Sequence, residues 1–413
     1  MKILHIGTWF GPPINGGLKY QYEYAKRLGQ EDRQFFILSV DSFGEEARAL
    51  ETLGVSGEGL LTYPRPHIGN VQRISGLLNR GKPPALVGFE GKCKVRLQQH
   101  IKKAIAEWKP DVAIVWSPNL AGVCAEVLSV PTLLFACDSM KLVNQSMAEH
   151  SPHGYQRWYH RLVACRYARW TVRAYAPYPH IVFVSSRDQA DCCLPVGAKT
   201  SVIPLGVDCK VYAPRCSTAV KRKPVLTFHG DLRYVANEEA VQWLISCLLP
   251  TLISRYGEDG FILRIIGKCT SRAILRQAEA HPYLEMTGYV DDLAAALGES
   301  TCYVAPLVIG GGMKTKILEA MACGLPIVGT EEAFSGQSCQ SGIQGIIVPR
   351  EKMIPAVLEL LNSPDDCRRL GIAARQWVEA QRDWNVCTMR LRTILREIVE
   401  NRNHAKTACI QAK

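Results

Sequence analysis

The chain reads GGGMKTKILEAMACGLP over residues 310–326, and this stretch decides the fold class. One apolar run precedes it at 302–306 and another follows at 326–330, so the pattern is strand, glycine loop, short helix and strand. Glycines let a backbone approach a phosphate closely, and the N–H groups at a helix start favour negative charge. Lys314 and Lys316 add positive charge at the same place.

One carboxylate, that of Glu319, lies inside the predicted helix. A carboxylate repels a phosphate, so its expected partner is a diol such as the two hydroxyls of a ribose. Loop, lysines and glutamate together predict a nucleoside diphosphate across the helix start. Two plainer interpretations stay open. The glycines would then form only a surface loop, and Glu319 would only stabilise the helix start, an effect worth roughly 0.3–1 kcal/mol.

Length and composition indicate a globular protein of two domains. The chain has 413 residues, of which 47% are hydrophobic and 21% charged. It contains no apolar run long enough for a spanning helix, and its apolar start predicts a strand rather than a signal peptide, so we expect a cytoplasmic protein. The 16 cysteines lack the spacing of a zinc or redox motif. Cysteines such as Cys137, Cys302 and Cys323 are therefore expected to be reduced and to lie in the core.

Positive charge is concentrated in the first half of the chain. Residues 1–200 hold 24 Lys/Arg and 16 Asp/Glu, a net +8 that leaves +3 of the total +11 for the rest. The segment between Glu149 and Asp188 has no acid and carries arginines interleaved with aromatic residues, among them Arg157, Arg161, Arg166, Arg169 and Arg173. This pattern is typical of a helix at a membrane interface, and equally of a helix that packs its aromatics inward. No nucleic-acid module accompanies it, so no nucleic-acid partner is expected.

Apolar runs alternate with amphipathic stretches in two successive blocks. Strands are predicted at 3–7, 35–40, 112–116, 132–136 and 181–184, then at 225–229, 261–266, 302–305, 327–329 and 345–348. A helix is expected at 18–28, and another over 375–400. The alternation predicts two doubly wound parallel sheets. We expect domains at 1–207 and 224–385, a linker at 208–223, and a helix at 386–413 that returns to the first domain.

The order of motifs resembles the GT-B glycosyltransferases, and specifically the retaining glycosyltransferase family 4. The resemblance is carried by PPINGG at 12–17, GVD at 206–208 with Pro214, FHG at 228–230, Gly267, GYVDD at 288–292 and LEAMACGLP at 318–326. It implies an α/β protein with two Rossmann-like domains facing across a cleft. The CDS sequence at 137–139, Asn237 and the lysine-bearing loop are similar to a bacterial subgroup associated with exopolysaccharide synthesis.

The resemblance also implies a donor site and catalytic residues. The donor-binding candidates are Gly16, Gly17, Gly230, Arg233, Asn237, Gly311, Gly312, Met313, Lys314, Lys316 and Glu319. Glu319, Lys316 and Asp138 are the catalytic candidates, although Asp138 is as well explained by an acceptor contact as by a helix cap. No cofactor is expected, because a nucleoside-diphosphate sugar is itself the donor substrate. No metal is expected either, because Lys314, Lys316 and Arg233 would neutralise the diphosphate and no spaced pair of aspartates stands out.

Three positions depart from the family pattern. The first of the two family glutamates would fall at Gly311, Asp231 stands where an arginine is usual, and Asn237 is near the position of a usual lysine. Arg233, Lys314 and Lys316 are the candidates to restore the missing positive charge.

The expected reaction transfers a sugar, with retention, from a nucleoside diphosphate to a saccharide, lipid-linked or small-molecule acceptor. An oxocarbenium-like species would be attacked on the face that the diphosphate leaves. Two alternatives stay open. A sugar-nucleotide isomerase of the 2-epimerase type would use His5, His229 and Asp138 as acids and bases. A non-catalytic partner subunit is favoured by Gly311 and Asp231. Peripheral contact with the inner face of a membrane is also open.

Overall fold

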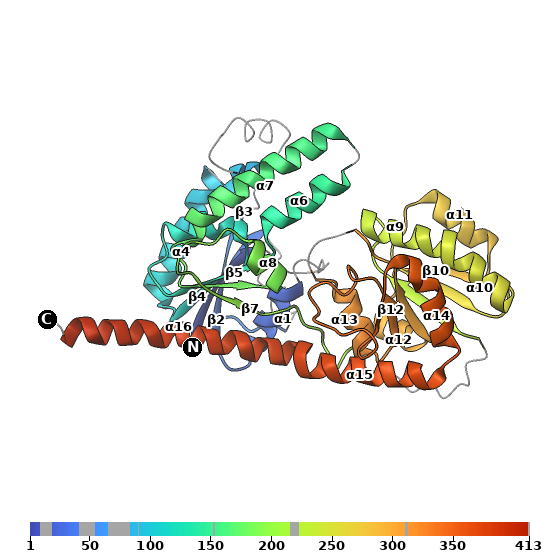
Figure 1. Cartoon of the computed structure of the whole chain (residues 1–413). Coiled ribbons are helices and arrows are strands. Elements are labelled where there is room, and N and C mark those ends of the chain that lie inside the picture. The colour runs from blue at the N-terminus through green and yellow to red at the C-terminus, as the bar shows by residue number, and fades with distance from the viewer. Residues whose placement is uncertain are drawn as a thin grey trace. The chain divides into compact units, whose positions relative to one another are not determined.

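The protein forms two compact units (Figure 1). The computed structural model describes residues 1–8, 19–40, 54–64, 83–89, 91–151, 153–214, 223–309 and 313–411. The first unit consists of Met1–Pro204 with Cys387–Lys413, and the second of Leu205–Val386. The described part of the expected linker, 208–214, is thus grouped with the second unit.

The first unit is built on a seven-stranded parallel sheet in the order β3-β2-β1-β4-β5-β6-β7. Its strands are β1 (Lys2–Thr8), β2 (Arg33–Val40), β3 (Gly59–Pro64), β4 (Val112–Val115), β5 (Thr132–Cys137), β6 (His180–Phe183) and β7 (Lys199–Val202). The chain connects them through α1 (Lys19–Leu28), α4 (Lys92–Trp108), α5 (Ala121–Ala125), α6 (Met140–His150), α7 (Gly154–Tyr175) and α8 (Ser186–Asp191). Two short 3-10 helices lie at Pro84–Phe89 and Pro118–Leu120.

Both faces of this sheet are covered by helices, because its inner strands are apolar on both sides. In β2, Ile37 belongs to the core cluster that includes Leu97 and Ile101 of α4. Its neighbours Phe36 and Leu38 cluster with Ala25 of α1 on the other face. Successive side chains of a strand point to opposite faces, so one apolar run supplies two core layers.

The second unit repeats the architecture with six parallel strands in the order β10-β9-β8-β11-β12-β13. Its strands are β8 (Val225–His229), β9 (Ile262–Ile266), β10 (Leu284–Gly288), β11 (Cys302–Ala305), β12 (Ile327–Gly329) and β13 (Ile346–Ile347). Its helices are α9 (Val235–Trp243), α10 (Leu249–Tyr256), α11 (Arg272–Ala280), α12 (Leu293–Gly298), α13 (Thr315–Ala322), α14 (Met353–Leu361) and α15 (Pro364–Arg382). A π-helical turn at Leu244–Leu248 joins α9 to α10, and a 3-10 turn at Arg350–Lys352 precedes α14.

The predicted strands are all present, within one or two residues at each end, and the doubly wound α/β class is confirmed. Three strands were not predicted: β3, β7 and β10. All three lie at sheet edges, where a strand is less enclosed and its sequence is correspondingly less apolar. The polar sequence KTSV of β7 shows the effect most clearly.

The segment predicted to be helical over 375–400 is helical except at Asp383, where the chain breaks between α15 and α16 (Trp384–Gln411). Asp383 has an extended backbone, and its carboxylate accepts hydrogen bonds from the N–H groups of Cys209 at 3.2 Å and Asn385 at 2.8 Å. Val207 pairs with Asp383 as an isolated bridge. The Asp383 carboxylate thus caps the start of α16 at this break.

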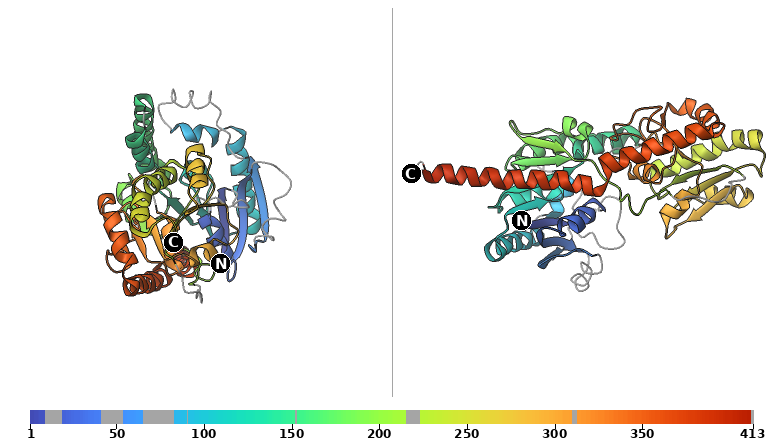
Figure 2. Two further views of the ribbon diagram at one scale, coloured as in Figure 1. Left: turned by 90° about the vertical axis from the view of Figure 1, so that its right-hand side faces the viewer. Right: turned by 90° about the horizontal axis from the view of Figure 1, so that it is seen from below.

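From Cys387 onward α16 belongs to the first unit and runs along it (Figure 2). A buried ionic contact fixes it there. The guanidinium of Arg392 donates to Asp32 at 3.0 Å and to Glu31 at 2.7 Å, and Arg392 is 8% exposed. Asp32, itself 9% exposed, also accepts from the amino group of Met1 at 2.9 Å.

We predict that Arg392→Met lowers the free energy of unfolding of the first unit by about 2 kcal/mol, because the buried Asp32 carboxylate keeps the Met1 amino group but loses its hydrogen bond to a charged guanidinium. Urea denaturation measures the change. Arg396→Met is the matched control: Arg396 is on the same helix but exposed, so its substitution changes stability by no more than about 0.5 kcal/mol. Equal effects of the two variants would contradict the role given to Arg392.

Candidate donor-binding site

The switch point of the second sheet lies between β8 and β11. These strands are neighbours at the centre of the sheet, and the strand order runs outward from them in both directions. In open α/β sheets, ligands bind outside the carboxyl ends of the strands at such a point. His229 is the last residue of β8, and α13 follows β11, so their side chains belong to this edge of the sheet.

The central contact of the site joins His229 to Glu319. The His229 Nε2 lies 3.0 Å from the Glu319 Oε2, and the two residues are 5% and 8% exposed. The His229 backbone N–H donates to the Tyr303 hydroxyl at 3.3 Å, and the two rings meet edge to face. Because a buried carboxylate is costly without a partner, this contact holds Glu319 in one position. Burial raises the pKa of the Tyr303 phenol. The Glu319 carboxylate also raises it, whereas the hydrogen bond from the His229 N–H lowers it.

Lys316 lies one helical turn before Glu319 on α13. Its Nζ sits 4.6 Å from the centre of the Phe228 ring and donates to the Asn237 side-chain oxygen. Asn237 also donates to the Asp231 carbonyl at 2.7 Å, so it links Lys316 to the turn after β8. The structure therefore brings together Lys316, Asn237, Glu319 and the β8 turn.

Gly230 is required by this arrangement. Its φ is +154°, and a Cβ there would lie 2.7 Å from the Lys316 Nζ and 2.9 Å from the Asn237 Nδ2. Gly267 follows β9 with a φ of +138°, and a Cβ there would lie 2.0 Å from the Gly230 carbonyl oxygen. Two glycine turns thus pack against each other, and the first leaves space for the ammonium group.

The charge of Lys316 is poorly solvated. The pKa of its ammonium group is lowered to about 7, mainly by burial; the Glu319 carboxylate raises it and the nearby Lys314 lowers it. A diphosphate placed against Lys316 would favour the protonated form again.

The other two candidate cations are engaged elsewhere. Lys314 forms an ion pair with Glu332 at 2.8 Å. Arg233 is paired with Asp231 through its Nε at 2.9 Å, and this contact lowers the pKa of the Asp231 carboxyl. Lys316 differs from both, because its ammonium group bonds Asn237, which in turn bonds the Asp231 carbonyl.

The remaining donor candidates are less informative. The side chain of Met313 packs in the hydrophobic core of the second unit, which leaves its main chain as the part that would meet a donor. Lys314 occupies the cap position of α13, and its side chain does not cap the first N–H groups. Gly311 and Gly312, like Gly16 and Gly17, lie outside the described residues.

Asp138 belongs to the first unit and follows β5. The helix-cap interpretation of Asp138 is wrong, because Ser139 caps α6: its hydroxyl accepts from the Leu142 N–H at 3.3 Å. The preceding residue, Cys137, has a φ of +61°, which is strained for a residue with a side chain. An acceptor contact of Asp138 stays a prediction.

The histidine partner of Glu319 was not identified from the sequence. The available signal was position alone, because His229 ends the first strand of the second block. His5, which the isomerase alternative would use, is a core residue. It stacks on Phe36 and accepts from the Trp116 indole at 3.0 Å, and burial lowers its pKa to about 3.

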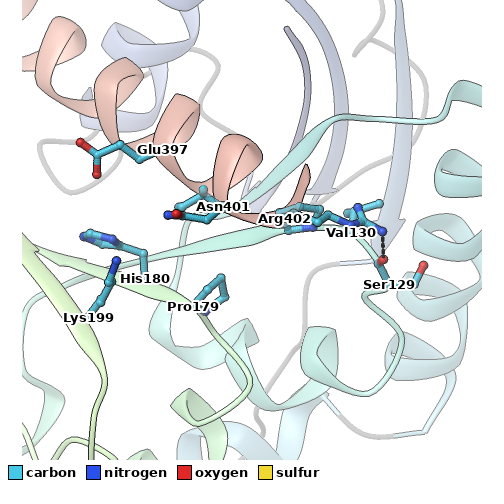
Figure 3. A pocket seen from close by; sticks show the side chains of 10 residues that line it. Ser129, Val130, Pro179, His180, Lys199, Glu397, Asn401 and Arg402 are labelled. Atoms are coloured by element: carbon cyan, nitrogen blue, oxygen red, sulfur yellow. Dashed lines mark hydrogen bonds between the residues drawn. The ribbon is translucent and has the colours of Figure 1, made fainter. Parts of the chain in front are cut away.

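The first unit contains a cavity of about 580 Å³ that is not the predicted donor site (Figure 3). It lies at the amino ends of β5, β6 and β7 beside α16, the edge opposite to the one that binds ligands in such sheets. Polar side chains on its wall include His180, Lys199, Glu397, Asn401 and Arg402. Arg402 donates to the Ser129 carbonyl at 3.1 Å and so helps to close α16 over this edge.

Two further searches covered the described part of the chain. No group of three or more His, Cys, Asp or Glu side chains is arranged there to hold a metal ion. None of the helices described is both long enough and apolar enough to cross a membrane.

Comparison with known proteins gives a matching family model and similar solved structures. Residues 223–363, which contain His229, Lys316 and Glu319, match the model of a family described as glycosyl transferases group 1. HepE from Anabaena, solved in complex with UDP and glucose, superposes with a TM-score of 0.65 at 13% sequence identity, covering 96% of this chain and 100% of that chain. The chain has the GT-B fold.

Two curated mycobacterial proteins are related in sequence. A GDP-mannose-dependent alpha-(1-6)-phosphatidylinositol monomannoside mannosyltransferase of Mycobacterium tuberculosis (strain CDC 1551 / Oshkosh) is 26% identical over 243 residues, which span 52% of this chain but only 61% of that protein. A phosphatidyl-myo-inositol mannosyltransferase of Mycolicibacterium smegmatis is 24% identical over 306 residues, 70% of this chain and 72% of its own. The chain is thus similar in sequence to glycosyltransferases, over the family-model region and over part of these two relatives.

We predict opposite pH dependences for stability and for nucleotide binding. The unfolded chain keeps the Lys316 proton up to about its ordinary pKa of 10.5, whereas the folded chain loses it from about 7. The unfolded state therefore binds more protons in this window, and the unliganded fold becomes more stable as pH rises through it. Nucleoside diphosphate binds the protonated form, so its affinity falls about tenfold per pH unit above pH 7.

Isothermal titration calorimetry in buffers of different ionisation enthalpy measures the proton taken up with the nucleotide. Lys316→Arg keeps the charge at every pH in the window, so it should bind without this pH dependence, and Lys316→Met should bind weakly throughout. A wild-type protein that binds equally well at pH 6 and pH 9 would contradict the role given to Lys316.

Proposed function

We propose that the protein is a retaining, metal-independent glycosyltransferase of family 4 that transfers a sugar from a nucleoside-diphosphate sugar to an acceptor hydroxyl. The observation that carries the proposal is the group formed by Glu319, His229 and Lys316 at the switch point of the second sheet. A fixed carboxylate and a poorly solvated ammonium group lie one helical turn apart. They complement the two chemically different ends of a nucleoside diphosphate, its diol and its phosphates.

Glu319 would accept hydrogen bonds from the two ribose hydroxyls. His229 already occupies one of its oxygens, at 3.0 Å, and so orients the carboxylate before the donor arrives. A carboxylate that is already held in place loses little entropy when the ribose hydroxyls bind, whereas a mobile surface carboxylate would have to be ordered first.

Lys316 would stabilise the leaving diphosphate. Negative charge grows on that group as the glycosidic bond breaks, and a cation already in place, with little water around it, stabilises the growing charge more than a solvated one does. The backbone N–H groups at the start of α13 lie at the positive end of the helix dipole, so they would also stabilise negative charge on the diphosphate. Because the leaving group is neutralised by protein groups, the reaction does not need a metal.

Retention follows if the acceptor hydroxyl attacks the face that the diphosphate vacates, and the departing phosphate then accepts the acceptor proton. No side chain of the proposed site is assigned as a covalent nucleophile, because Glu319 is directed to the ribose. Asp138 of the first unit is proposed as a contact of the acceptor.

The acceptor is proposed to be lipid-linked, among the three classes that the family resemblance allows. The curated relatives are named as transferases acting on phosphatidylinositol compounds, which supports a lipid acceptor. The protein would then act in polysaccharide or glycoconjugate synthesis at the cytoplasmic face of a membrane.

A thermal-shift panel of UDP-glucose, GDP-mannose, UDP and GDP tests donor binding. We expect the nucleotides of one base, uracil or guanine, to raise the melting temperature of the wild-type protein. Glu319→Ala should weaken the binding of those nucleotides about 10- to 100-fold, because hydrogen bonds to a charged group are lost. Each variant is compared with its own unliganded melting temperature. Glu285→Ala, which removes a carboxylate paired with Arg264 in the same unit, should leave the shift unchanged.

Release of the nucleoside diphosphate in the presence of a lipid-linked acceptor tests the transfer itself. Undiminished donor binding by Glu319→Ala would remove Glu319 from the site. Interconversion of free sugar nucleotides without an acceptor would replace the transferase by an isomerase.

A further inference from the structure

The helices α6 and α7 form a hairpin with an unusual tip. They pack against each other as neighbouring rods, the end of α6 and the beginning of α7 forming one end of the pair (Figures 1 and 2). The His160 ring and the Asn144 side chain connect the two helices at 3.2 Å. We define the hairpin tip by Met147 of α6 and by Tyr155, Arg157, Trp158 and Arg161 of α7.

Large apolar side chains are exposed at this tip. Tyr155 is 70% exposed, Trp158 63% and Met147 50%. Farther along α7, Tyr167 and Tyr175 are buried in the first unit. The two ends of α7 therefore differ. Aromatic residues in its second half pack inward, whereas those at the hairpin tip are exposed to solvent.

The exposed side of α7 is also strongly basic. Arg157 and Arg161 are four residues apart, as are Arg169 and Arg173, and all four are exposed. Neither α7 nor the segment from Glu149 to Asp188 supplies a carboxylate, and none of the four forms an ion pair with a described residue. Like charges four apart destabilise an isolated helix by a few tenths of a kcal/mol for each pair.

We propose that the hairpin tip docks on the surface of an anionic lipid bilayer. Tyr155 and Trp158 would enter the headgroup region, where a ring with an apolar body and a polar edge is most stable. Arg157 and Arg161, one turn apart beside them, would contact the anionic headgroups. The exposed Met147 adds apolar area beside the two rings, as in a surface that enters the headgroup region, and binding of a nucleic acid instead is an outcome of the test below.

Docking is specific to the tip. Arg169 and Arg173 lie 12 residues farther along α7, about 18 Å at 1.5 Å per residue. That distance exceeds the screening length of about 8 Å at physiological salt, so these arginines contribute little when the tip is at the surface. The pair Arg169 and Arg173 has the same spacing, helix and exposure as Arg157 and Arg161, which makes it a matched control.

Vesicle sedimentation with the full chain tests the proposal, without donor or acceptor, so its outcome is independent of the proposed reaction. Vesicles of phosphatidylcholine are compared with vesicles of phosphatidylcholine and phosphatidylglycerol. We expect binding to the anionic vesicles that weakens with salt, and little binding to the neutral ones. R157Q/R161Q should weaken binding about fivefold per charge, or about 25-fold in total. R169Q/R173Q should stay within about twofold of the wild type.

The aromatic side chains are tested by Y155S/W158S, which should weaken vesicle binding several-fold while leaving its salt dependence unchanged. Circular dichroism confirms that each variant is folded. Equal binding to the two kinds of vesicle, or equal losses in R157Q/R161Q and R169Q/R173Q, would overturn the proposal. So would tight binding of a single-stranded RNA that R157Q/R161Q abolishes, if the vesicles are not bound.

Discussion

The hydrogen bond between His229 and Glu319 is the contact on which the candidate site depends. It joins the end of β8 to α13 across the switch point, and both groups are buried. A carboxylate in such a place is stable only with a partner, so the histidine helps to fix the orientation of the carboxylate. The six-stranded sheet and the two glycine turns after β8 and β9 keep that partner in place.

The same edge of the sheet carries a second constraint, the poorly solvated ammonium group of Lys316. The fold places it against Phe228, Gly230 and Asn237, where its proton is held weakly. Stability and binding thus make opposite demands on one side chain. The unliganded protein favours the neutral amine, whereas an anionic ligand favours the ammonium. Side chains with a strongly shifted pKa are common at functional sites, where the bound ligand stabilises the charge that the protein alone disfavours.

Much of the architecture was predictable from the sequence, because inner strands of a parallel sheet are buried on both faces and therefore have short, nearly continuous apolar sequences. Strands β3, β7 and β10 were not, since edge strands need less apolar surface. The break at Asp383 depends on its contact with Val207, which is far away in sequence. In the site, Glu319 and Lys316 were apparent from the glycine loop and helix, whereas His229 is brought to them only by the sheet order. The pairing of Arg233 with Asp231, and of Lys314 with Glu332, likewise required the structure.

The central claim is that the Glu319 carboxylate binds the ribose diol, and a thermodynamic cycle tests it most directly. Binding of the preferred nucleoside diphosphate and of its 2′- and 3′-deoxy analogues is measured by calorimetry in the wild-type protein and in Glu319→Ala. If the claim holds, loss of a ribose hydroxyl weakens binding to the wild-type protein but not to the variant. Equal penalties for the deoxy analogues in both proteins would show that the ribose lies elsewhere.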